Sequence, residues 1–321
     1  MAVFTAVSEA EAQSLLDRLG LGRLRLLTGI KAGIENSNFF VDTETGSFVL
    51  TVFERLSHAQ LPFYLGLMQH LAAKGLPVPA PQADRDGQTL FTLQGKPAAL
   101  VSRLRGGHQL APDIFHCEQL GRTLARLHLG VADFPLQQPN LRGLAWWLSA
   151  SQAVLPHLDA ERAALLHSEL AFQQQIAARV LELPRGAIHA DLFRDNAMFE
   201  GLPGREQLSG VFDFYFAGVD SFLFDLAVCL NDWCIDLESG RLIEERAAAL
   251  VAAYERARPL SGAEHRLLPA LLRAAALRFW ISRLYDWHLP REASLLKPHD
   301  PTHFERVLRL RRESAWHALQ A

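Results

Sequence analysis

The segment HADLFRDN at residues 189–196 constrains this chain more than any other stretch of its sequence. It places His189, Asp191 and Asn196 in the spacing H-x-D-x-x-x-x-N, and Asp213 follows later at the end of the apolar run that leads into VFDF. Each residue alone is weak evidence, because Asp and Asn are common in loops. All of them in this order, each beside an apolar strand-like run, are a strong signal for one functional loop.

This spacing fits the chemistry of phosphoryl transfer from ATP. One carboxylate accepts the proton of an attacking hydroxyl, so Asp191 is the candidate catalytic base. Asn196 and Asp213 are candidate ligands of magnesium, which prefers hard oxygen donors and often takes only one or two of them from the protein. The alternative for each residue is an ordinary turn or a helix cap.

Two further polar residues are expected to support this loop. His189 is expected to brace it through hydrogen bonds to nearby backbone or to a carboxylate, in preference to transferring protons. Asp225 lies in the segment FDLA, where an apolar helix starts, and a buried carboxylate there is costly unless it accepts hydrogen bonds. Holding the backbone of the loop would satisfy Asp225, and an N-cap is the alternative. Asp195 is either a second polar contact or a solvated turn residue.

The polar segment GIENSN at residues 33–38 is a candidate cover for phosphates, because small and polar residues let backbone amides approach them closely. Many ordinary hairpins have similar sequences, so this segment is evidence for phosphate binding only because it lies upstream of the loop. The candidate nucleotide-binding residues here are Gly33, Ile34, Glu35, Asn36, Ser37 and Asn38.

The order of strand-like and helix-like segments predicts an α+β chain in two lobes. The first, residues 1–105, is a small β-rich nucleotide-binding lobe of antiparallel strands, and the second, residues 106–321, is mainly helical and carries the loop and the substrate site. A nucleotide is expected in the cleft between them. The expected strands are residues 24–30, 39–41, 48–53, 89–93 and 97–104, and the expected helices are residues 8–19, 61–74, 115–129, 142–155, 160–183 and segments from 223 onward.

Composition excludes several classes of protein. The chain has 321 residues and a net charge of −3, and no dense run of Lys and Arg suggests a nucleic-acid partner. Neither a signal peptide nor an apolar run long enough for a membrane span is visible, so a cytoplasmic location is expected. The three cysteines, Cys117, Cys229 and Cys234, are too few for a disulfide scaffold and are expected to be buried reduced thiols.

With these residues in place, the chain resembles the aminoglycoside phosphotransferase and choline kinase superfamily, a branch of the protein-kinase-like fold. The resemblance runs from Gly33 to about Trp233 and rests on residues 124–128 (LARLH), 189–196, 211–217 and 224–227. Within the superfamily the chain looks most like the homoserine kinase branch. That second resemblance lies in residues 33–41, 49–54, 61–64, 138–141, 231–234 and 278–284.

The resemblance implies an enzyme that transfers the γ-phosphate of ATP to L-homoserine, giving O-phospho-L-homoserine and ADP on the way to threonine. The catalytic Asp of the family maps to Asp191, and its metal positions map to Asn196 and Asp213. ATP and Mg²⁺ are the implied cofactors.

One position departs from the superfamily pattern. A lysine is expected on the third strand, where this chain has Thr51, and the helix that would supply its glutamate partner, residues 61–74, contains no Asp or Glu. In kinases that lysine holds the phosphates. Both halves of the ion pair are therefore absent, and magnesium and backbone amides are left to offset the phosphate charge. Lys31 is one candidate substitute, and a solvated strand lysine is the alternative.

L-Homoserine carries a hydroxyl, an ammonium and a carboxylate, so its site needs an acid for the amine and an arginine for the carboxylate. We expect Asp232 or Glu35 to meet the ammonium and Arg278 or Arg283 to meet the carboxylate. Ion pairs inside the lobe are the alternative. Two neighbours complete the candidate substrate site, Arg194 in the loop and Trp233 next to Asp232.

Two rival hypotheses remain from the sequence. One is a kinase for another alcohol: choline would need an aromatic cage, and an aminoglycoside would need many carboxylates. Acidic residues are few in the candidate substrate region, and its two arginines suggest a substrate with an anionic group. A catalytically silent nucleotide-binding protein would explain Thr51, but it would not need both a base and two metal ligands. The oligomeric state is not fixed by the sequence.

Overall fold

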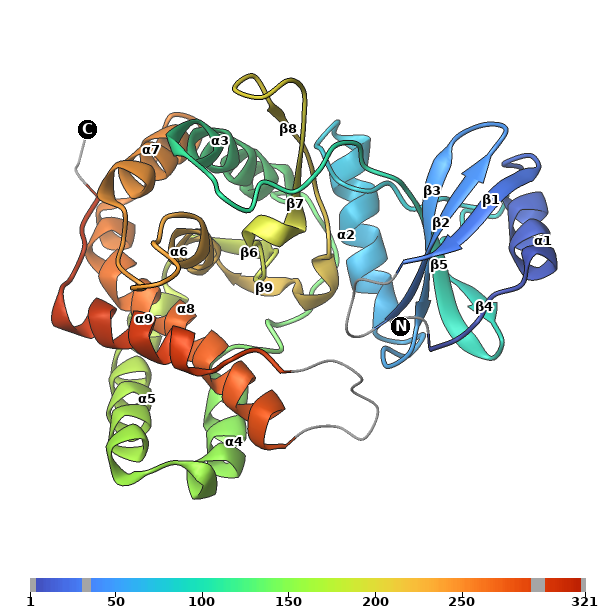
Figure 1. Ribbon diagram of the computed structural model, residues 1–321. Coiled ribbons are helices and arrows are strands. Elements are labelled where there is room, and N and C mark those ends of the chain that lie inside the picture. The colour runs from blue at the N-terminus through green and yellow to red at the C-terminus, as the bar shows by residue number, and fades with distance from the viewer. Residues whose placement is uncertain (1–3, 31–35, 290–297, 319–321) are drawn as a thin grey trace. The chain divides into compact units, whose positions relative to one another are not determined.

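The computed structural model describes residues 4–30, 36–289 and 298–318. The described residues divide into two compact units, one up to Arg105 and one from Gly106 onward, and each is considered by itself (Figure 1).

A five-stranded antiparallel sheet forms the first unit, with the strand order β1-β2-β3-β5-β4. Burial alternates strictly along β2, so Phe39 and Val41 face an apolar cluster that also receives Leu15 and Leu16 from α1. The elements of this unit are α1 (Glu9–Leu19), β1 (Leu24–Gly29), β2 (Asn36–Thr43), β3 (Ser47–Phe53), α2 (Leu61–Ala73), β4 (Phe91–Leu93) and β5 (Lys96–Ser102).

Helices dominate the second unit, with α6 at its centre (Figure 1). Every residue of α6 is buried. It contacts α3, α7 and α8, which lie around it. The helices are α3 (Ile114–Gly130), α4 (Leu144–Val154), α5 (Ala160–Leu181), α6 (Phe222–Trp233), α7 (Glu244–Glu255), α8 (Gly262–His288) and α9 (Thr302–Glu313).

A close helix contact joins α3 to α7. Gly121 of α3 lies so near α7 that a Cβ atom there would stand 2.2 Å from the carbonyl oxygen of Leu250. Glycine is therefore required at this point, because the backbones approach more closely than any side chain allows.

Two short antiparallel strand pairs frame the functional segment of the second unit. The strand β6 (Arg185–Ile188) pairs with β9 (Gly218–Ser221), and β7 (Ala197–Glu200) pairs with β8 (Gln207–Val211). The connection from β6 to β7 is the loop that contains the motif of residues 189–196. The strand-like runs beside the motif are thus separate short strands, because the polar residues of the loop between them do not pair in a ladder.

The predicted order of β-rich and helical parts is confirmed, with boundaries that differ by a few residues. The largest difference is β2, which begins at Asn36, whereas the sequence predicted a strand over residues 39–41. Its polar side chains fit the strand because Ser37 turns inward and finds hydrogen-bond partners there.

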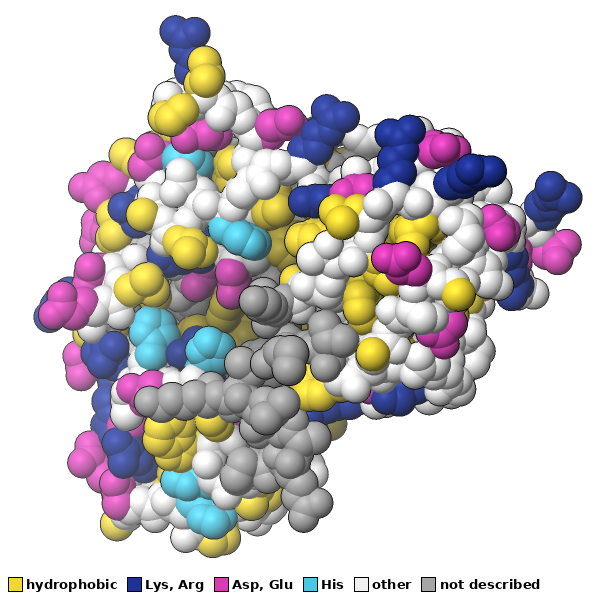
Figure 2. Space-filling model, turned by 45° about the vertical axis from the view of Figure 1, so that its right-hand side comes forward, with side chains coloured by type: hydrophobic (Ala, Val, Ile, Leu, Met, Phe, Trp, Pro, Cys, Tyr) yellow, Lys and Arg dark blue, Asp and Glu magenta, His cyan; other side chains and the backbone are white. Residues whose placement is uncertain are grey.

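The three cysteines are free and buried, which confirms that prediction. In the part of the chain that the structure describes, no helix combines the length and apolar character needed to cross a membrane. On the face drawn in Figure 2, acidic and basic side chains are interspersed.

Candidate active site

The loop of residues 189–196 is closed by its own hydrogen bonds. The amide of Phe193 donates to the carbonyl oxygen of Asp191 at 2.8 Å, and the side-chain Nδ2 of Asn196 donates to the same oxygen at 2.8 Å. Ala190 adopts a φ of 64°, a conformation that non-glycine residues rarely take. The loop thereby turns sharply after β6 and leaves the side chain of Asp191 half-buried.

Asp225 of α6 holds this turn in place. Its carboxylate accepts the backbone amides of His189 at 2.9 Å and Ala190 at 2.8 Å, and it also lies 3.1 Å from Nε2 of His128. Burial acts to raise the pKa of Asp225, but the hydrogen bond from His128 and the backbone donors hold it below its ordinary value. Asp225 is therefore an ionised anchor for the strained loop.

A chain of hydrogen bonds continues from Asp225 to α7. Burial lowers the pKa of His128, so its ring is neutral and donates through Nε2 to Asp225. Its Nδ1 then accepts from the hydroxyl of Tyr254 at 2.7 Å, and Arg258 donates to that hydroxyl at 3.1 Å. The motif LARLH ends in this histidine, which sequence analysis did not assign to the site.

His189 links the loop to the end of β8. Its Nε2 lies 2.8 Å from the carbonyl oxygen of Phe212, and its Nδ1 lies 3.2 Å from the amide of Asp191, which donates to it. The ring packs against Phe214 with centroids 4.6 Å apart. Both nitrogens are occupied by backbone, an arrangement suited to bracing the loop.

Asn196 and Asp213 lie at the same end of the β7–β8 pair. Asn196 precedes β7 and Asp213 follows β8, and the amide of Phe212 donates to the carbonyl oxygen of Asn196 at 3.0 Å. Asp213 takes a left-handed conformation with φ 65° and ψ 58°, which breaks the strand at this point. Because Nδ2 of Asn196 is used within the loop, its Oδ1 is the atom left to accept or coordinate.

The oxygen donors of Asn196 and Asp213 fit magnesium, which often takes only one or two ligands from protein. Within residues 4–30, 36–289 and 298–318, no group of three His, Cys, Asp or Glu side chains is arranged to hold a metal ion. The donor set therefore suits a metal that relies on phosphates and water for its remaining ligands.

Asp191 stands beside the buried Arg278 of α8, with Oδ1 and Nη1 3.4 Å apart. Burial raises the pKa of Asp191 to about 7, Arg278 opposes this rise, and the negative charges of Asp213 and Asp195 reinforce it. The 3.4 Å separation is long for a charge-assisted hydrogen bond. Arg278 thus holds the Asp191 carboxylate only weakly, and this carboxylate can take up a proton near neutral pH.

Arg278 is itself incompletely satisfied. Burial lowers its pKa to about 10, and its Nε atom has no hydrogen-bond partner among the described residues. Its guanidinium lies over the rings of Phe279 and Phe216, at 3.8 Å and 5.2 Å from their centres.

Arg194 and Asp232 form an ion pair inside the second unit. The amide and Nε of Arg194 donate to Oδ2 of Asp232 at 2.8 Å and 3.1 Å, and Nη2 of Arg194 donates to the carbonyl oxygen of Asp232. This geometry favours the intralobe alternative for Arg194. Oδ1 of Asp232 accepts no hydrogen bond from the residues described.

Trp233 is fully buried, and its indole nitrogen donates to the carbonyl oxygen of Leu192 at 3.0 Å. A side chain without exposed surface supports the loop and does not face a substrate, contrary to our expectation for this residue. Arg283 lies over the ring of Phe304 at 4.4 Å and donates to the carbonyl oxygen of Asp300 at 3.4 Å.

The nucleotide candidates divide into two groups. Asn36, Ser37 and Asn38 belong to β2, whereas Lys31, Gly33, Ile34 and Glu35 lie outside the described residues. Ser37 is fully buried and donates to Glu54 at 2.6 Å, so its hydroxyl serves the core of the first unit.

Thr51 replaces the expected strand lysine with a neutral contact. It lies opposite Asn38 in the β2–β3 ladder, and its hydroxyl donates to Oδ1 of Asn38 at 2.8 Å.

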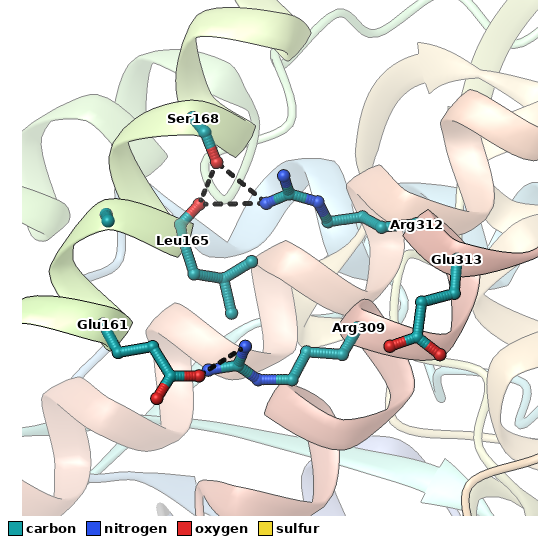
Figure 3. Close-up of a pocket in the computed structure, with 7 residues that line it drawn as sticks. Glu161, Leu165, Ser168, Arg309, Arg312 and Glu313 are labelled. Carbon is teal, nitrogen blue, oxygen red and sulfur yellow. Dashed lines mark hydrogen bonds and ion pairs between the residues drawn. The ribbon is translucent and has the colours of Figure 1, made fainter.

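A surface hollow of about 440 Å³ lies between α5 and α9, and no residue of the loop lines it (Figure 3). Its two arginines are already paired: Arg309 with Glu161 at 3.0 Å, and Arg312 with the hydroxyl of Ser168 at 2.8 Å. Arg312 also lies 3.8 Å from the carboxylate of Glu169, so both arginines have an acid nearby. Since no candidate site residue lines the hollow, it has no evident part in the chemistry.

Comparison with known proteins identifies the family of this chain. A sequence profile of the phosphotransferase enzyme family matches residues 27–260. A homoserine kinase of Polaromonas naphthalenivorans is 60% identical over 97% of this chain and 98% of its own length, and one of Cupriavidus pinatubonensis is 56% identical over 97% and 96%.

Among solved structures, an amicoumacin kinase in complex with AMP-PNP, Ca²⁺ and Ami has a TM-score of 0.67 at 16% identity, over 95% of this chain and 93% of that one. This likeness confirms the predicted protein-kinase-like α+β fold. From the match over most of its length, the chain belongs to the phosphotransferase enzyme family.

Proposed function

We propose that this protein transfers the γ-phosphate of ATP to the hydroxyl of L-homoserine, giving O-phospho-L-homoserine and ADP in threonine biosynthesis. The observation that carries this proposal is the 52–60% identity, over nearly the whole chain, to relatives named homoserine kinase. The loop that brings Asp191, Asn196 and Asp213 into one part of the second unit supports the same reaction.

Asp191 would act as the base. Its carboxylate would orient the attacking hydroxyl and accept its proton as the new O–P bond forms and the bond to ADP breaks. A pKa of about 7 suits this task, because a base whose pKa lies near the working pH is both available and strong enough.

Asn196, through Oδ1, and Asp213 would hold Mg²⁺. When bound, magnesium would offset the negative charge of the phosphates. His189 and Asp225 would keep these ligands and the base in register through the backbone contacts of the loop. These roles agree with the chemistry of the donor atoms.

The substrate would be held by charged residues near Asp191. Of the two arginines considered for the carboxylate, Arg278 is better supported, because it stands beside Asp191 and has an Nε atom without a described acceptor. For the ammonium we propose Oδ1 of Asp232, which accepts no hydrogen bond from the described residues. Glu35 remains the second candidate for the ammonium.

The phosphates would be covered by the segment from Lys31 to Asn38, with Asn38 and Thr51 forming a neutral pair where kinases have a lysine. Magnesium would then offset more of the phosphate charge than it does beside that lysine. We also propose a cytoplasmic location, in keeping with ATP as a substrate and with three free, buried cysteines. Nucleic acid and membrane are not expected as partners.

The test is ADP release with magnesium and ATP against a panel of L-homoserine, L-serine, choline and kanamycin, with Asp191→Ala beside the wild type. Turnover confined to L-homoserine and lost in the variant is the expected result. Turnover with another alcohol alone would contradict L-homoserine as the substrate but support the assignment of the protein as a kinase. No turnover with any of the four would favour a silent nucleotide-binding protein.

A further inference from the structure

Arg142 is a second arginine in the neighbourhood of Arg278, and sequence analysis did not single it out. It lies just before α4, half-buried, with its guanidinium over the ring of Trp146 at 4.4 Å. No Asp or Glu among the described residues forms an ion pair with it. Arg142 is thus a half-buried cation that packs on aromatic rings and has no carboxylate counter-charge among these residues.

The Phe216 ring brings the two arginines together. The guanidinium carbon of Arg142 lies 5.8 Å from the centre of this ring, and that of Arg278 lies 5.2 Å from it. Their charges are close enough that Arg142 contributes to lowering the pKa of Arg278. Asp191 and Asp286 are the acids that oppose this effect.

We propose that Arg142 and Arg278, both packed against Phe216, bind the carboxylate of the acceptor alcohol and select acceptors that carry one. The inference rests on the proposed function and adds a specificity residue to it. A bound carboxylate would give Arg142 its missing counter-charge and would give Nε of Arg278 an acceptor. Planar guanidinium groups suit a carboxylate because they donate in pairs.

The dimensions agree with a small acceptor. In L-homoserine the hydroxyl oxygen and the carboxylate carbon are separated by four bonds, which span at most about 5 Å. Asp191 and Arg278 approach to 3.4 Å, so one short molecule can contact both. When the hydroxyl of L-homoserine contacts Asp191, the carboxylate of the same L-homoserine molecule therefore lies within reach of the arginines.

Arg142 is well suited to a mutational test because its backbone is held independently of its side chain. Its amide donates to Oδ1 of Asn140 at 2.9 Å, and its carbonyl oxygen accepts from the indole of Trp147 at 2.5 Å. Truncating the side chain leaves both contacts in place, so the start of α4 is expected to remain folded.

The experiment compares L-homoserine with 3-aminopropan-1-ol, which is the same molecule without its carboxylate, in wild type, Arg142→Ala and Arg142→Lys. In Arg142→Ala we expect KM for L-homoserine to rise about tenfold or more while kcat/KM for 3-aminopropan-1-ol stays within about twofold. Arg142→Lys keeps the charge without the fork of donors, so an intermediate KM is expected. Arg309→Ala, which removes a paired arginine of α9, is the matched control and should change neither substrate.

The two substrates separate binding from structure. Equal losses with both in Arg142→Ala and Arg142→Lys, or an unchanged KM for L-homoserine, would overturn the role of Arg142 and leave the homoserine kinase proposal intact. Failure of the wild type to phosphorylate L-homoserine, with turnover of some other alcohol, would overturn both proposals. Thermal unfolding of each variant identifies a loss that comes from misfolding, and Arg142→Lys then decides the question.

Discussion

At the scale of single residues, the site is governed by the balance around Asp191. Burial and the neighbouring acids favour its protonated form, whereas Arg278 favours the charged form. The result is a carboxylate that changes charge near neutral pH. This balance has consequences for both the rate and the stability of the protein.

The rate should depend on the ionisation of Asp191. Because the base must be deprotonated and its pKa is about 7, kcat/KM should rise with pH through neutrality and level off above it. Initial rates from pH 5.5 to 9 with excess magnesium would measure the midpoint. Since Arg278 lowers the pKa of Asp191, Arg278→Gln should move this midpoint to higher pH. A midpoint that came from titration of the nucleotide would be the same in the variant. A flat profile would contradict the assignment.

The free energy of unfolding should change with pH in the opposite sense to the rate. The pKa of Asp191 is raised on folding from 3.8 to about 7, so the native state gains from its proton and this contribution is lost as pH rises through that window. Each pK unit corresponds to about 1.4 kcal/mol.

Asp191→Asn should therefore be inactive yet more stable than wild type at pH 8, with a smaller difference at pH 5. Chemical denaturation at the two pH values provides the measurement. A variant less stable than wild type at pH 8 would show that the charged carboxylate is not costly in the folded protein.

At the scale of elements, the loop is positioned from behind by α6. Asp225 accepts two loop amides, and its hydrogen bonds continue through His128 and Tyr254 to α7. The position of α7 against α3 therefore bears on the loop, although neither helix contributes a candidate catalytic residue.

Gly121 tests this helix contact. A methyl group at this position would meet the carbonyl oxygen of Leu250 at 2.2 Å, so Gly121→Ala should force α3 and α7 apart and cost about 1–3 kcal/mol or more. Gly107→Ala is the matched control, because a Cβ there meets nothing within 4 Å. Thermal unfolding of both variants would show the difference, and an unchanged Gly121→Ala protein would mean that the helices can separate at little cost.

At the scale of the whole molecule, the fold was largely predictable and the site only partly so. A helix was predicted over residues 8–19, and the structure shows α1 there with a Ser8–Glu11 capping box at its start. The spacing of Asp191, Asn196 and Asp213 in the sequence also grouped them into one candidate site. Arg142 was missed because its significance lies in an absent counter-charge and in packing on Phe216, which no local pattern reveals. The ion pair between Arg194 and Asp232 was not predicted either, because the two residues are distant in sequence.

Magnesium should be needed for turnover but not for the fold. Each unit has buried apolar residues of its own, and among the described residues no cluster of three metal-binding side chains holds the chain together. We expect EDTA to abolish ADP release and to leave the melting temperature of the protein unchanged. Added magnesium should restore the rate. Turnover that persists in EDTA, or a lowered melting temperature, would contradict these roles of the metal.

The base, the proposed magnesium ligands and both arginines of the carboxylate site all follow residue 106, within one unit of the chain. Choice of acceptor can therefore diverge among related enzymes through changes in the second unit alone. A hybrid that carries the first 105 residues of a relative should keep the acceptor of this protein. In evolutionary terms, a new acceptor is within reach of a few exchanges around Phe216, with the first 105 residues and the magnesium ligands left untouched.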